Sequence, residues 1–265
     1  MNTKEERVER GLDAYRLKLI ALLLMIVDHV HTYILWCYTH TPQWISVVTR
    51  IVSPLFLYLM IDGFYHTRSR KKFLLRLFAA AFIMLIGKVI INYSFHNVDY
   101  ITGEYSFSSL TQGNNIFLTL AWMFALVWCM ENIKYKKNTI LNVFLAIIIA
   151  FLSLASEGGF YLLPITVIVW WFHGRKKWQC LGICAWCIIL FIKSLSNNLM
   201  GNTGNISLYS YMCFSNEWGM FLVVPFILMY NGERGKNTKF TKYLFYVAYP
   251  VHLWILMIIS YLLEK

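Results

Sequence analysis

The chain has few charged residues. Only 14% of its 265 residues are Asp, Glu, Lys or Arg, whereas about a quarter are charged in a typical soluble domain. Apolar residues make up 58% of the chain and come in long runs. Such runs are typical of membrane-spanning helices, because a helix needs about 20 residues to cross a hydrocarbon core about 30 Å thick. The composition excludes an ordinary soluble enzyme and predicts an all-α, polytopic membrane bundle.

Acidic residues are scarcest: 13 Asp and Glu stand against 24 Lys and Arg, for a formal net charge of +11. In a soluble protein this excess would suggest a nucleic-acid partner. Here twenty of the 24 cations lie in the N-terminal segment and in alternate loops between apolar runs, as in the cytoplasmic loops of membrane proteins. We therefore expect no nucleic acid, a lipid bilayer (plasma or inner membrane) and a cytoplasmic N-terminus.

The sequence also shows no signal-peptide pattern, internal repeat or disulfide framework. The six cysteines lie mostly within apolar runs, where they are interpreted as packing residues. Without a matched pair of broken segments, the sequence gives no support to an inverted-repeat transporter. No metal site is expected.

The apolar runs predict nine spans in a single transmembrane domain, 17–262, preceded by a cytoplasmic segment, 1–16. The fifth and sixth runs are short, so a re-entrant pair is the alternative to two complete spans there. The predicted spans are 17–36, 45–64, 74–93, 113–130, 139–154, 160–173, 179–193, 216–230 and 243–262.

The first span carries Asp28 and His29 near its middle. Ionisable groups at that depth are costly and therefore suggest a functional site. His29 is predicted to act as a general base or a covalent acyl carrier, because imidazole takes a proton near neutral pH. Asp28 points about 100° away from its neighbour and is expected to pair with Arg50 or Lys88. The alternative is a buried polar pair that holds helices together.

Lys18 lies eleven residues before His29, so the two share a helix face about 16 Å apart along the axis. With the other cytoplasmic cations, Lys18 is predicted to bind a polyphosphate, although lipid head groups would explain most of these cations. The glycines of Asn231–Gly235 permit close approach to an anion; a helix end followed by a turn is the alternative. The predicted cofactor-binding residues are Lys18, Arg16, Arg68, Arg70, Lys71 and Arg234.

Further candidates lie near the outer ends of spans and on the last span. Glu157 and Glu217 could recognise an amine-bearing acceptor, or be helix-end residues in water. Tyr249 and His252 are three residues apart on one helix face, so they could contact substrate, or belong to the aromatic belt at the membrane interface.

Several blocks together resemble the TraX family, named for the conjugation protein that acetylates the N-terminus of F-pilin. These are LKLIALLLMIVDH, RIVSPLFLYLMIDGFYHTRSRKKF, NNIFLTL, LMYNGERG and KYLFYVAYPVHL. Lys18-x10-His29 and Tyr246-x2-Tyr249-x2-His252 are similar to motifs on the first and last spans of the wider transmembrane acyltransferases, including the acyltransferase-3 family.

The resemblance implies acetyl transfer from cytoplasmic acetyl-coenzyme A to an amine or hydroxyl on a peptide, glycan or small molecule. By position, His29 would be catalytic and Lys18 would face the coenzyme, while Arg50 or His252 could polarise the carbonyl oxygen. The rival prediction is an ion- or proton-coupled transporter with a relay of Asp28, His29, Arg50 and Lys88. The motif set favours the enzyme.

Overall fold

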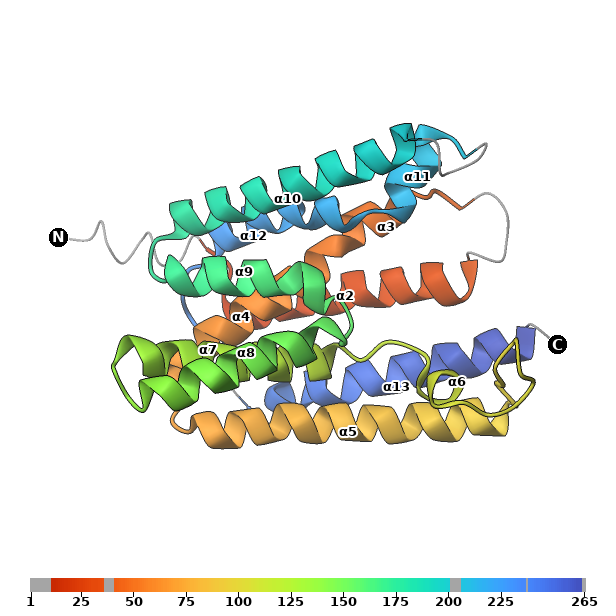
Figure 1. Ribbon diagram of the computed structural model, residues 1–265, viewed down its shortest axis with the longest axis horizontal. Helices are drawn as coiled ribbons and strands as arrows, with labels where there is room; N and C mark the ends of the chain where they lie inside the picture. The colour runs from red at the N-terminus through yellow and green to blue at the C-terminus, as the bar shows by residue number, and fades with distance from the viewer. Residues whose placement is uncertain (1–10, 36–40, 201–205, 237, 264–265) are drawn as a thin grey trace. The chain divides into compact units, whose positions relative to one another are not determined.

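The computed structural model describes residues 11–35, 41–200, 206–236 and 238–263, and most of these residues are helical (Figure 1). Each predicted span contains a helix, and the described residues form no β-strand beyond an isolated bridge between Leu12 and Tyr230. The helices are α2 (Ala14–Tyr33), α3 (Ile45–Val48), η2 (Thr49–Ile51), α4 (Val52–His66), α5 (Arg70–Ser94), α6 (Phe107–Thr111), α7 (Ile116–Lys134), α8 (Thr139–Leu154), α9 (Gly159–Trp171), α10 (Lys176–Leu199), α11 (Leu208–Phe214), η3 (Glu217–Val223), α12 (Val224–Met229) and α13 (Lys239–Leu263).

Five helices among the described residues are long and apolar enough to cross a membrane. A sixth candidate is the pair Leu208–Phe214 and Glu217–Met229, if these segments, bent by 67°, form one span. The helices α8 and α9 are apolar but shorter. The all-helical, polytopic prediction is thus confirmed, whereas the count of nine complete spans is not. The five helices are Ile45–His66, Arg70–Ser94, Ile116–Lys134, Lys176–Leu199 and Tyr243–Leu263.

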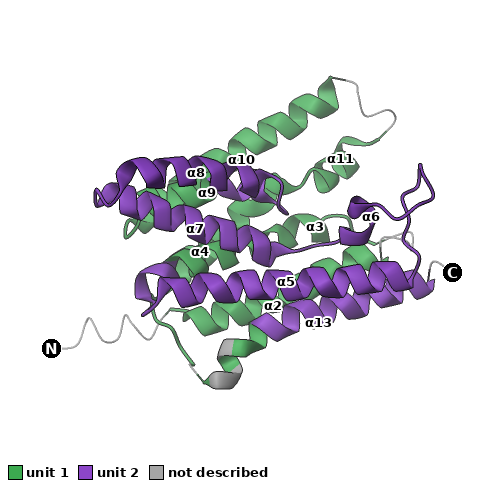
Figure 2. Cartoon of the chain, turned by 60° about the horizontal axis from the view of Figure 1, so that its bottom comes forward, with its two compact units in different colours: residues 1–61, 164–245 green, residues 62–163, 246–265 purple. Residues whose placement is uncertain are grey.

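The chain divides into two compact units (Figure 2). The first unit comprises Met1–Ile61 and Pro164–Phe245, and the second comprises Asp62–Leu163 and Tyr246–Lys265. Three continuous helices, α4, α9 and α13, pass from one unit to the other.

In the first unit, α2 buries a stripe of side chains spaced four residues apart: Leu17, Ala21 and Met25. This spacing places them on one face of the helix. The same unit contains a close crossing between α3 and η3, where a Cβ atom on Gly219 would lie 2.7 Å from the carbonyl oxygen of Val47. Glycine is required there because any side chain would overlap the opposite backbone.

In the second unit, α5 and α13 lie side by side (Figures 1 and 2), and Gly87 of α5 fits against the indole of Trp254. Helix α7 is buried along most of its length, and α8 packs along it. By contrast, α8 exposes nearly all of its apolar side chains. A helix that is apolar on its exposed face suits a lipid environment.

Candidate functional site

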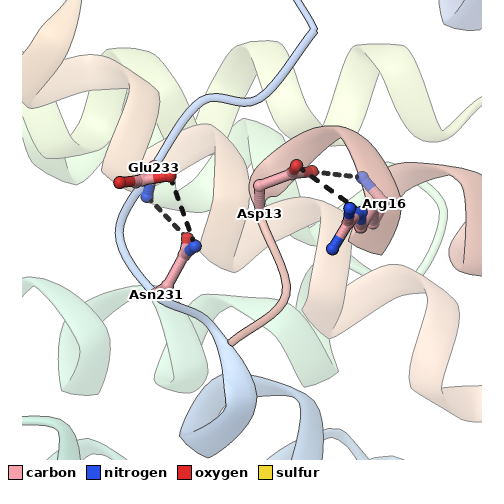
Figure 3. Close-up of polar contacts among 4 residues, drawn as sticks. All are labelled: Asp13, Arg16, Asn231 and Glu233. Atoms are coloured by element: carbon pink, nitrogen blue, oxygen red, sulfur yellow. Dashed lines mark hydrogen bonds and ion pairs between the residues drawn. The ribbon is translucent and has the colours of Figure 1, made fainter. Parts of the chain in front are cut away.

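Helix α2 begins with a capped N-terminus. The Asp13 carboxylate accepts a hydrogen bond of 2.7 Å from the backbone N–H of Arg16, and its other oxygen lies 3.8 Å from Arg16 Nε (Figure 3). An aspartate at this position satisfies one of the free N–H groups at the helix start. The side chain of Arg16 remains 63% exposed.

The Asn231–Gly235 segment is attached to this end of α2. The carbonyl of Glu233 accepts a 2.8 Å hydrogen bond from the N–H of Ala14, and the N–H of Asn231 donates to the carbonyl of Leu12 at 3.0 Å. The Asn231 side chain in turn accepts from the N–H of Glu233 at 2.9 Å (Figure 3). Two residues on, Gly235 has a φ of +69° and its Cα faces the Asp13 carboxylate so closely that a Cβ would overlap it.

Helix α12 ends at Met229 and the chain bends at Gly232, which agrees with a helix end at this segment; binding of an anion by its glycines stays a prediction. The space beside Gly235 is taken by the Asp13 carboxylate, whereas a Cβ on Gly232 would meet no described atom within 4 Å. The segment nevertheless brings Arg234 to the same end of the unit as Arg16 and Lys18.

We call the four cations of this end, Arg16, Lys18, Lys176 and Arg234, the basic end of the first unit. Lys18 Nζ lies 5.9 Å from the ring centre of Phe245. The ammonium of Lys176 donates to the carbonyl of Tyr230, next to the Asn231–Gly235 segment. Lys176 is not among the predicted cofactor-binding residues, because its only signal in the sequence is its place in a basic loop. Guanidinium and ammonium groups from three segments suit a phosphate-rich ligand.

His29 lies on the buried stripe of α2 and is only 4% exposed. Its ring packs edge-on against Tyr33, with 6.3 Å between the ring centres. Because α2 is continuous from Lys18 to His29, eleven residues separate the two along the axis by about 16 Å. The helix therefore connects the basic end to an enclosed imidazole.

The Asp28 carboxylate accepts a hydrogen bond from the hydroxyl of Thr49, which is buried in η2. The predicted ion pair between Asp28 and Arg50 is wrong for the described residues. In a 3₁₀ turn successive side chains point about 120° apart, so Thr49 faces Asp28 and its neighbour Arg50 points elsewhere. The other predicted partner, Lys88, donates to two backbone carbonyls of its own unit.

Arg50 is partly buried, and its Nε atom is buried with no hydrogen-bond partner among the described residues. A buried N–H group without an acceptor is costly. Because Thr49 is bonded to Asp28, the next residue on η2 lies at about the level of Asp28 and His29 on α2. Arg50 thus carries a buried donor without a described acceptor, one residue from the Thr49–Asp28 contact.

The basic residues that begin the second unit's α5 are mostly in contact with water. Arg68 and Lys71 are exposed. The guanidinium of Arg70 stacks on the ring of Phe64, 4.0 Å from its centre, which is a favourable cation–π distance. Ser69 caps the helix by accepting from the N–H of Lys72.

Glu157 and Tyr249 both bind the start of α7. The Glu157 carboxylate accepts from the N–H of Asn115, and the Tyr249 hydroxyl accepts from the N–H of Ile116 at 3.2 Å. His252 lies beside Tyr249, with 5.7 Å between ring centres, and its Nδ1 is 2.7 Å from the carbonyl of Ala248. Glu217, in the first unit, is the first residue of η3.

Comparison with known proteins identifies the family. The family model described as TraX protein matches residues 14–260. The chain belongs to the TraX family. The matched region of this TraX-family chain includes both Lys18 and His252, and the resemblance found in the sequence is confirmed.

One curated relative of this TraX-family chain is the "probable fimbrial assembly protein FimC, serogroup H1" of Dichelobacter nodosus. It is 24% identical over 253 residues, which cover 94% of this chain and 97% of that protein. No solved structure gives a significant match.

Proposed function

We propose that the protein is a membrane-bound acetyltransferase that moves an acetyl group from cytoplasmic acetyl-coenzyme A to an amine or hydroxyl acceptor. The observation that supports it most is the geometry of α2, with the basic end of the first unit at one end and a buried imidazole about 16 Å along the same helix. The TraX family is associated with pilin acetylation, and a relative is named as a fimbrial assembly protein. Both favour a peptide acceptor.

The coenzyme's phosphates would bind at the basic end of the first unit. Arg68, Arg70 and Lys71 would add positive charge to the same cytoplasmic side, by the positive-inside distribution. The linear pantetheine arm would follow α2 inward, so that the thioester reaches His29. The chain's contribution at this stage is to bind and to position the thioester.

His29 would take the proton as the acceptor nitrogen or oxygen attacks the thioester carbonyl. The new bond to the carbonyl carbon forms, the carbon–sulfur bond breaks, and the proton passes from His29 to the departing thiolate. A general base of this kind contributes about 10²–10⁴-fold to the rate. The N–H groups of Arg50 would stabilise the charge on the carbonyl oxygen during attack. Transfer through an acetyl-imidazole on His29 uses the same residues.

The test compares His29→Ala with His31→Ala. Both histidines are buried on α2, at 4% and 2% exposure, so the second variant controls for the loss of a buried ring. Cells with and without the protein are compared by mass spectrometry of surface peptides and glycans, to find the product that carries an added acetyl group. We expect that product to disappear in His29→Ala and to persist in His31→Ala, at equal protein levels in the membrane. Normal acetylation by His29→Ala would refute the proposal.

A further inference from the structure

Helix α7 begins half-way along α5. Helix α5 has 25 residues and is therefore about 37 Å long. The side-chain amide of Asn115, the residue before α7, donates to the carbonyl of Ala81 at 3.0 Å. Ala81 lies eleven residues from Arg70 and thirteen from Ser94, the two ends of α5. If α5 crosses the bilayer, the start of α7 lies near the middle of the bilayer.

The non-helical segment before α7, residues 112–115, runs along the outer half of α5. The ammonium of Lys88 donates to the carbonyls of Thr111 and Gly113 at 2.9 and 2.8 Å. One turn further out, Asn92 donates to the carbonyl of Gln112 in this segment and to that of Leu110 in α6. Both side chains are buried. Non-helical backbone at membrane depth is tolerated only where protein or water satisfies it, and here two buried polar side chains do so.

The turn between α8 and α9 contacts the start of α7. The two helices have 16 and 13 residues, or about 24 and 20 Å, and are shorter than a hydrocarbon core of about 30 Å. The hydroxyl of Thr119, in the first turn of α7, donates to the carbonyl of Glu157 at 2.7 Å. In Figure 1, α7 and α8 stop part-way along α5, while α5 and α13 continue. The turn 155–158 therefore lies near half depth as well.

The Glu157 side chain is nevertheless exposed. A carboxylate at this depth cannot face acyl chains without a large cost, so it faces water or another polar group. A second polar atom lies close by: Asn115 Oδ1 is buried and has no hydrogen-bond partner among the described residues. The backbone N–H of the same residue, Asn115, donates a hydrogen bond to the Glu157 carboxylate. An acceptor oxygen and a carboxylate side by side suit the N–H groups of an amine.

We propose that α8 and α9 form a re-entrant hairpin from the cytoplasmic side, and that Glu157, at its tip, lines a water-filled vestibule open to the outer face, with the Oδ1 atom of Asn115 buried directly behind it. The vestibule admits the amine end of the acceptor to half the depth of the membrane. The identity of this occupant rests on the proposed acetyl transfer, whereas the vestibule itself does not. The hairpin replaces the predicted fifth and sixth spans and leaves all other loops on their predicted sides.

The test is cysteine labelling in intact cells with a charged, membrane-impermeant thiol reagent. Ser156→Cys places a thiol in the turn. Phe151→Cys, one turn earlier on α8 and 76% exposed, is the matched control at nearly the same depth on the apolar face. Ile101→Cys, 92% exposed in the 94–112 loop, reports the outer side, and Lys137→Cys reports the cytoplasmic side. The wild-type chain gives the background, since its described cysteines are buried or partly buried.

We expect external reagent to label Ser156→Cys and Ile101→Cys, but not Phe151→Cys, and to label Lys137→Cys only after the cells are opened. Millimolar glycinamide, a small amine, should slow labelling of Ser156→Cys several-fold, and Glu157→Gln should remove this protection. Absence of external labelling at Ser156→Cys would overturn the vestibule, and labelling without protection would overturn the amine site. Labelling of Ser156→Cys should be unchanged when His29 is also replaced by Ala. The labelling therefore tests the vestibule alone, and the loss of acetylation in His29→Ala tests the acetyltransferase proposal.

Discussion

Replacement of Thr49 with Val tests whether the contact between α2 and η2 holds the candidate site together. Valine has nearly the same shape as threonine but lacks the hydroxyl that donates to Asp28. Thr49 is buried at 3% exposure, so no bulk water replaces the lost donor. A hydrogen bond to a charged group contributes about 1.5–3 kcal/mol, and a buried acceptor left unpaired is costly in addition.

A loss of this size lowers the midpoint of thermal unfolding by roughly 3–12 °C, at about 2–4 °C per kcal/mol for a chain of this size class. We expect Thr49→Val to show this decrease in detergent or nanodisc, and to lose most acetyl transfer, because η2 also carries Arg50. Thr49→Ser retains a hydroxyl and should behave nearly as the wild type. Thr32→Val makes the same chemical change at an exposed position of α2 and should have little effect.

The measurement is thermal unfolding followed by tryptophan fluorescence, together with the acetylation assay on the same preparations. If Thr49→Val unfolds at the same temperature as Thr32→Val and retains full activity, the Asp28–Thr49 contact neither stabilises the fold nor positions η2 and its Arg50 for the reaction.

The remaining predictions concern the basic end of the first unit. Lys18→Ala should raise the KM for acetyl-coenzyme A about tenfold or more and leave kcat nearly unchanged, because it removes a charged contact to a part of the substrate that does not react; a fall in kcat alone would contradict this role. Gly235→Ala should lower stability by more than Gly232→Ala: both have positive φ, but only Gly235 faces the Asp13 carboxylate. Strained backbone conformations of this kind cost about 1–3 kcal/mol. Equal unfolding temperatures for Gly235→Ala and Gly232→Ala would show that the Asn231–Gly235 segment moves away from Asp13 without loss of stability.

Helix positions were predictable because apolar runs of span length leave little choice but helix. The run that begins at Thr139, for example, is helical over the predicted bounds. Whether a short run crosses the bilayer completely is harder to predict from the sequence. A run of 13 to 16 apolar residues fits either a short span or half of a re-entrant hairpin. The contact between the 155–158 turn and the middle of the second unit favours the hairpin, but this contact joins residues far apart in the sequence and no local pattern predicts it.

The candidate site was predictable where it depends on helix periodicity and not where it depends on long-range contacts. The alignment of Lys18 with His29 follows from 3.6 residues per turn. The partner of Asp28 does not, because charge suggested Arg50 while a 3₁₀ turn presents Thr49. Likewise, Glu157 was considered for substrate binding on its charge, and only the fold shows that it also binds the start of α7.

Helix α2 carries charged residues that crossing a membrane alone does not require. Helix α2 has 20 residues but is not among the five helices apolar enough to cross a membrane by composition; it carries Arg16, Lys18 and Asp28. Each would be costly in lipid. Arg16 and Lys18 lie at the helix start, within reach of the membrane surface, and Asp28 is bonded to a buried hydroxyl. The described contacts of Asp13 with Arg16 and of Asp28 with Thr49 place these charges where protein or the membrane surface can satisfy them, so α2 depends for its stability on contacts with the rest of its unit and not on apolar composition alone.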